Sequence, residues 1–117
     1  MTENSTKTEY FASTVAATEY EPFLVDGDAV GEVHWIRSNG SDDSTLIVGL
    51  WKCEPDSFPY PFGNDETIHA LDGELEIALE SGEVVTLTAG DVASFAKGTQ
   101  STWTVKSPFK KLFVISG

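Results

Sequence analysis

Apolar and polar side chains alternate with a period of two residues along most of the chain from Ala29 onward. The clearest case is G-E-L-E-I-A-L-E at residues 73–80, where Leu75, Ile77 and Leu79 share one face and the glutamates take the other. The same alternation recurs in three further segments, around Val33, Val85 and Trp103. Such alternation is typical of strands with one buried face, so the pattern predicts an all-β domain.

Two runs depart from alternation, because they are apolar at nearly every position: T-L-I-V-G-L-W at residues 45–51 and K-L-F-V-I at residues 111–115. Runs of this kind indicate strands that are covered on both faces. Gly, Asp, Asn, Ser and Pro clusters break the chain every eight to twelve residues and predict turns. The predicted turns are Asp26–Asp28, Ser38–Asp43, Asp72-Gly73, Ser81-Gly82, Ala89–Asp91, Lys97-Gly98 and Ser107-Pro108. The spacing favours a sandwich or barrel without a long helix.

The length of 117 residues predicts a single domain. Residues 1–20, rich in Thr, Ser and Glu, are expected to be an N-terminal arm or loose tail, and residues 21–117 the barrel. Short barrels leave strand edges that need covering, so we expect a homodimer in which the arm around residues 10–20 takes part.

Charge and cysteine content narrow the class of partner. Seven Lys and Arg against nineteen Asp and Glu give a net charge of −12, which argues against binding to nucleic acid or to an anionic membrane. The lone Cys53 allows no internal disulfide, and the first residues show no secretory signal, so a cytoplasmic protein is expected.

Two glycine-framed motifs, E-T-I-H-A-L-D-G at residues 66–73 and G-D-V-A-S-F-A-K-G at residues 90–98, have the spacing of the two halves of a cupin. Together with G-L-W-K-C-E-P-D-S-F, S-T-W-T-V and K-K-L-F-V, they make residues 49–114 similar to the cupins that include the (S)-ureidoglycine aminohydrolase domain and the ethanolamine-utilisation cupins. The resemblance implies a small antiparallel β-barrel of the RmlC-like jelly-roll type that holds a small molecule.

The same resemblance places one carboxylate, Glu66, inside the barrel as a candidate general acid or base. The alternative is a structural carboxylate held by Tyr60 or by a backbone amide. Aromatic side chains and one lysine are expected to line a modest ligand pocket around it, although an ordinary core is the competing interpretation. The predicted pocket residues are Trp51, Tyr60, Phe62, Phe95, Trp103 and Lys111. Lys111 is expected to pair with Glu66 or with an anionic substrate.

Most of the family's metal ligands are missing. Pro59–Phe62 stand where cupins carry a His-x-His pair, and Ser101 stands where a late histidine is usual. We therefore predict no tightly held metal and no cofactor. A non-standard metal site built from Glu66, His69 and His34 is the alternative.

The sequence thus predicts a small-molecule-binding cupin. A hydrolase or isomerase acting on a small polar or nitrogenous metabolite is one possibility that the resemblance raises. A non-catalytic ligand-sensing or accessory cupin is another, and a metal-dependent enzyme with the non-standard ligand set is the third. Fold analogy alone does not decide between them.

Overall fold

The computed structural model describes residues 10–40 and 44–117, and in these residues every regular element is a β-strand. The strands are β1 (Glu21–Val25), β2 (Asp28–Gly40), β3 (Thr45–Cys53), β4 (Asp56–Pro61), β5 (Asp65–Leu79), β6 (Val84–Thr88), β7 (Val92–Phe95) and β8 (Gln100–Ser116). All pairings are antiparallel. The all-β prediction is confirmed, and the described chain contains no helix that could cross a membrane.

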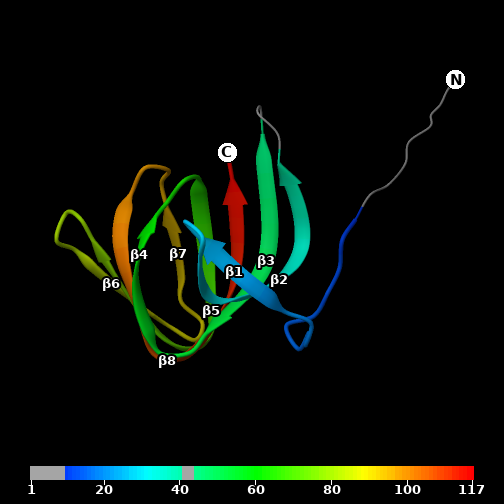
Figure 1. Cartoon of the computed structure of the whole chain (residues 1–117), viewed down its shortest axis with the longest axis horizontal. Helices are drawn as coiled ribbons and strands as arrows, with labels where there is room; N and C mark the ends of the chain where they lie inside the picture. The colour runs from blue at the N-terminus through cyan, green and yellow to red at the C-terminus, as the bar shows by residue number, and fades with distance from the viewer. Residues whose placement is uncertain (1–9, 41–43) are drawn as a thin grey trace, which may run out of the picture.

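Two long strands, β5 and β8, connect the two sides of the barrel. They pair with each other along most of their length. The first half of β8 also pairs with β4 and its second half with β3, while β5 pairs with β7 at its start and with β6 at its end. Figure 1 shows β8 curving at the bottom of the view, from its orange half beside β4 to its red half.

The bend in these strands corrects two predicted turns. Asp72-Gly73 and Ser107-Pro108 do not end strands; they lie opposite each other inside β5 and β8, where the register shifts. Gly73 has a φ of 78°, and a Cβ at this position would lie 2.0 Å from the carbonyl oxygen of Pro108. Gly73 therefore forms a bulge at which β5 bends from one side of the barrel to the other. The turn signal in the sequence does not distinguish such a bulge from a turn that ends a strand.

The other predicted turns fall between strands. Asp26-Gly27 joins β1 to β2, and turns at Ser81, at Ala89-Gly90 and at Lys97-Gly98 separate the strands from β5 to β8. The turn predicted at Ser38–Asp43 lies partly outside the described residues, since β2 continues to Gly40.

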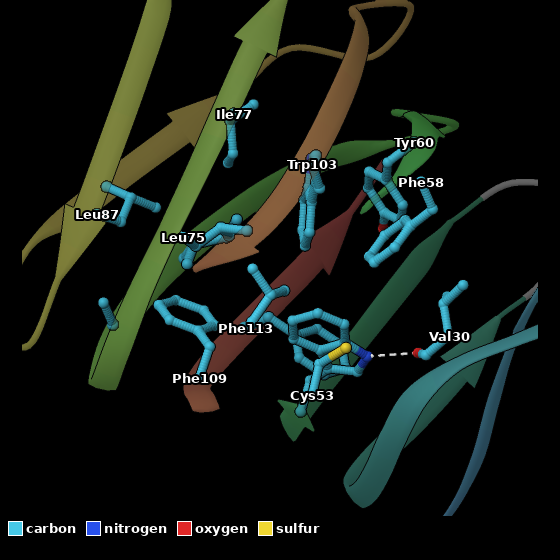
Figure 2. Packing of buried hydrophobic residues seen from close by; sticks show 14 of the residues in the cluster. Val30, Cys53, Phe58, Tyr60, Leu75, Ile77, Leu87, Trp103, Phe109 and Phe113 are labelled. Atoms are coloured by element: carbon cyan, nitrogen blue, oxygen red, sulfur yellow. Dashed lines mark hydrogen bonds between the residues drawn. The ribbon is translucent and has the colours of Figure 1, made fainter. Parts of the chain in front are cut away.

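The core is one cluster inside the barrel, built from the inward-facing side chains of the strands. Its largest members are aromatic: Trp51, Phe58, Phe62, Trp103, Phe109 and Phe113. Figure 2 shows Trp103 between Leu75 and Ile77 on one side and Phe58 and Tyr60 on the other. The indole nitrogen of Trp51 donates to the carbonyl of Val30 at 2.9 Å, drawn as the dashed line, and so satisfies its polar group inside the core.

Candidate functional site

Glu66 lies on β5, where alternation turns its side chain inward between the exposed Asp65 and Thr67. Its carboxylate is 3 % exposed. Tyr60 on β4 donates its hydroxyl to Glu66 Oε1 at 2.7 Å, and Lys111 on β8 donates its ammonium to Oε2 at 2.8 Å. Both carboxylate oxygens therefore have a partner from another strand, as a buried charge requires. We call these three residues the Glu66 triad.

Lys111 is the second charged member of the triad, and its side chain is as deeply buried as that of Glu66. Its ammonium lies 4.3 Å from the ring centre of Trp103 and about as near two other rings, at 5.0 Å for Trp51 and 5.2 Å for Phe113. Burial lowers the pKa of Lys111 because the charged ammonium loses water, while the nearby carboxylate of Glu66 opposes this effect.

Tyr60 shows the opposite effect. Burial raises the pKa of its phenol, and the negative charge of Glu66 and the hydrogen bond to that carboxylate raise it further. The phenol therefore stays protonated and acts as a donor to Glu66. Ser101 fixes the neighbourhood, because its hydroxyl donates to the carbonyl of Tyr60 at 2.7 Å and accepts from the indole nitrogen of Trp103 at 3.1 Å.

The space beside the triad is small. It measures about 10 Å³, which is room for about one water molecule. Its walls are Phe23, Val30, Trp51, Phe58, Tyr60, Glu66, Trp103, Lys111, Phe113 and Ile115. Aromatic rings thus fill most of the interior beside the triad, and the modest ligand pocket stays a prediction. Phe62 and Phe95 do not line this space; they stack on each other with ring centres 4.8 Å apart.

Five lining residues were not among the predicted site residues: Phe58, Phe113 and Ile115, and, from the β1–β2 hairpin, Phe23 and Val30. The hairpin precedes the segment that carries the family motifs, so the resemblance did not point to its two residues. The only signal in the sequence for a role of this hairpin is Phe23 itself, an aromatic residue shortly before the Asp26-Gly27 turn. The hairpin places Phe23 and Val30 over the end of the core cluster at which the indole of Trp51 donates a hydrogen bond to the carbonyl of Val30.

The donors of the alternative metal site do not converge. His69 lies three residues from Glu66 on β5 and is exposed on the opposite face, as alternation predicts. His34 contacts the N-terminal arm on the outside of the barrel. Within residues 10–40 and 44–117, no three His, Cys, Asp or Glu side chains are grouped so that they could hold one metal ion. The cation beside Glu66 is instead the ammonium of Lys111.

Cys53 is buried at the inner face of β3, close to Glu54 and Asp56. Burial, together with the smaller effects of the carboxylates of Asp56 and Glu54, raises the pKa of its thiol to about 11. A thiol in this state is a poor nucleophile at neutral pH, so Cys53 acts as a core residue.

The fold and this interior cluster define a cupin. Residues 40–113 match the model of the EutQ-like cupin domain, which is more than half of the chain, and the protein belongs to this family. A search of curated proteins gives no match.

Solved structures agree with this assignment. A putative ethanolamine utilization protein Q from Salmonella typhimurium LT2 is 25 % identical with a TM-score of 0.68, over 82 % of this chain and 76 % of the other. A DUF861 family protein from Thermotoga maritima is 29 % identical with a TM-score of 0.55, over 56 % and 75 % respectively. An RmlC-like cupin from Shewanella frigidimarina NCIMB 400, 16 % identical, shares the fold with a TM-score of 0.68 over 93 % and 91 %.

Proposed function

We propose that this cupin binds a small polar molecule at the Glu66 triad. The observation that supports the proposal is the placement of an ammonium and a phenol within hydrogen-bond reach of one buried carboxylate inside an apolar barrel. Ionisable groups so deeply buried are costly to keep, and groups with shifted pKa values gather at functional sites. The alternative is a structural role, in which the triad only holds strands together, and a binding experiment must exclude it.

A ligand needs more room than the closed barrel provides, and the β1–β2 hairpin is where we propose that it enters. β1 is a five-residue edge strand that pairs only with β2 among the described strands. Phe23 on β1 and Val30 on β2 are both walls of the free space. The short edge strand β1 is easier to displace than the long central strands, because only its pairing with β2 holds it in the sheet.

The triad also meets one requirement of the finer prediction, a hydrolase or isomerase with Glu66 as acid or base. Such chemistry needs a second polar group within reach of the carboxylate, and Tyr60 and Lys111 both qualify. A ligand-sensing barrel without turnover would use the same three groups, so the two functions differ only in whether the bound molecule reacts.

Calorimetric titration with three small probes tests the proposal: ethanolamine as a cation, glycine as a zwitterion and acetate as an anion. Ethanolamine is included because the Salmonella relative carries that compound in its name. We expect at least one probe to bind the wild-type protein. Binding of ethanolamine or glycine, whose ammonium groups can donate to Glu66, should weaken roughly 10- to 100-fold in Glu66→Gln, the range of a lost charge-assisted hydrogen bond. Acetate has no donor for Glu66 and would contact Lys111, so its binding should not weaken in this variant.

Glu76→Gln is the matched control, because Glu76 is a partly exposed glutamate on the same strand, with its side chain 3.5 Å from Lys106. This variant should bind as the wild type does. If no probe binds the wild-type protein at millimolar concentration, or if both variants bind ethanolamine and glycine equally well, the proposed site is wrong.

We also propose that a second copy of the chain covers the outer face of β3 and β8. The apolar side chains of Leu46, Val48, Leu112 and Val114 on this face are only partly buried within one chain. The arm beside them exposes further apolar groups, with Tyr10 81 % and Val15 56 % accessible. Equilibrium sedimentation should give twice the mass of 12.7 kDa at micromolar concentration, and a monomer there would contradict the proposal.

A further inference from the structure

Lys111 differs from every other lysine of the described chain in being buried. Its neighbour Lys110 points to the outside of β8, where it donates to the carbonyl of Val15. Lys52 and Lys106 form exposed ion pairs on the barrel surface. Lys111 faces three aromatic rings and one carboxylate, so its amine is held in a dry, apolar environment.

A lysine in such an environment has a distinct reactivity. Loss of water lowers the pKa of Lys111, so the neutral amine is formed more readily than on an exposed lysine. The proton has a short path, because Glu66 Oε2 lies 2.8 Å from the nitrogen. Tyr60 bonds the other carboxyl oxygen and keeps the carboxyl group oriented while the proton is on either side of the pair.

We propose that Lys111 forms an imine with the carbonyl carbon of a small aldehyde or ketone. The inference rests on the proposed function, because the interior must first admit a small molecule. It adds the class of ligand, a carbonyl compound of a few carbon atoms, and the atom that reacts with it, Lys111 Nζ.

The reaction needs only the groups present. Lys111 first passes its proton to Glu66, and the neutral amine then attacks the carbonyl carbon to form the C–N bond. The carbonyl electrons move to oxygen, which takes the proton from Glu66, while the nitrogen loses a proton to the same carboxylate. Glu66 next protonates the hydroxyl, which leaves as one water molecule as the C=N bond forms. The ammonium and the carbonyl compound thus give a protonated imine and water, without oxidation or reduction.

Size supports a small substrate. The free space beside the triad is about 10 Å³, so each additional carbon of the ligand requires further displacement of Phe23 or its neighbours. Acetaldehyde, with two carbons, is a suitable probe. The rings of Trp51 and Trp103 flank the amine and would contact the bound carbonyl compound.

Reductive trapping of the wild-type protein tests the inference. The protein is incubated at neutral pH with a limiting amount of acetaldehyde and cyanoborohydride, which reduces an imine to a stable ethylamine, and the labelled peptides are mapped by mass spectrometry. We expect ethylation of Lys111 to be several-fold faster than that of Lys110, because burial lowers the pKa of Lys111 and a larger share of its amine is neutral. Label on the exposed lysines without label on Lys111 overturns the inference.

Two variants complete the test. Lys111→Met replaces the amine with an apolar side chain of similar length and must lose the fast-forming adduct. Lys110→Met must keep this adduct. If Lys111→Met does not fold, the peptide map of the wild-type protein still decides the question. Binding of the probes that is weakened by Glu66→Gln, together with an unlabelled Lys111, would refute imine formation and leave the proposed function standing. Absence of both binding and label would refute both.

Discussion

The two faces of strands β3 and β8 each carry a kind of side chain that is unusual for its position. The inner face, which is closed to solvent, carries an ammonium ion at Lys111 that pairs with Glu66. On the outer face the apolar Leu50 of β3 and Leu112 of β8 are cross-strand neighbours, and His34 of β2 lies next to Leu50. A charged group inside the barrel needs a partner that bonds it, and an apolar group outside needs a cover that excludes water. The two faces obtain these partners differently.

The inner face is complete within one chain. Both oxygens of Glu66 have donors, and the free space is about that of one water molecule. The outer face is covered only in part. There the arm crosses the sheet: the ring of His34 lies 2.7 Å from the hydroxyl of Ser13 and donates through Nδ1 to the carbonyl of Glu19 at 2.8 Å. Leu50, which lies on this face, is 1 % exposed. Apolar outer positions are thus suited to an interface, and the buried charges to a ligand site.

The largest expected effect comes from breaking the inner ion pair. Lys111→Ala leaves the Glu66 carboxylate buried without its cation and should lower the free energy of unfolding by about 3–5 kcal/mol. Lys106→Ala is the matched control, because Lys106 also lies on β8 and pairs with a glutamate of β5, but on the surface. It should cost less than about 1 kcal/mol. Urea denaturation measures the loss of unfolding free energy in both variants. Equal losses would mean that the buried Glu66–Lys111 pair matters no more for stability than the surface pair.

Removal of the arm probes the outer face and should have the next largest effect. A chain lacking residues 1–19 exposes the surface around Leu50 and should lose about 1.5–3 kcal/mol of unfolding free energy, the value of burying one large apolar side chain. A chain lacking only residues 1–9 keeps every described contact of the arm and serves as the control.

A double-mutant cycle tells whether Leu50 accounts for this loss. In the Leu50→Ser background the same truncation should cost distinctly less, because the apolar side chain that the arm covers is already gone. An identical cost in both backgrounds would show that the arm stabilises the barrel through other contacts.

The sequence predicted the strands well wherever alternation is clean. Leu75, Ile77 and Trp103 lie inward as expected, and the apolar runs of β3 and β8 are shielded on both sides to different degrees. Alternation failed at Gly73, because a glycine that bends a strand and a glycine that ends one carry the same local signal. The partner of Gly73, Pro108, is distant in sequence and known only from the fold.

For the site, the resemblance pointed to Glu66, Lys111 and several aromatic residues, and their role as a ligand site stays a prediction. It could not give the free volume between these side chains. Whether aromatic rings enclose a cavity or fill it depends on side-chain packing, which the pattern of residue types does not contain. The contribution of Phe23 and Val30 depends on the pairing of β1 with β2, a contact that becomes visible only when the register is known.

The smallest predicted effect concerns Cys53 and tests how well water is excluded from the inner face at this residue. The ordinary pKa of a cysteine thiol is 9.0, and in the folded protein burial raises the pKa of Cys53 to about 11. The folded state therefore keeps its proton where the unfolded state loses it, so the stability that the thiol contributes is complete below pH 9 and is lost as the pH rises through 11. Between about pH 8 and pH 10 the loss amounts to roughly 1 kcal/mol. Tyr60 and Lys111 also titrate in alkaline solution, and comparison with Cys53→Ala cancels their effects. The free energy of unfolding of the wild type relative to this variant should thus fall between these two pH values. A constant difference would indicate that water reaches the inner face at Cys53.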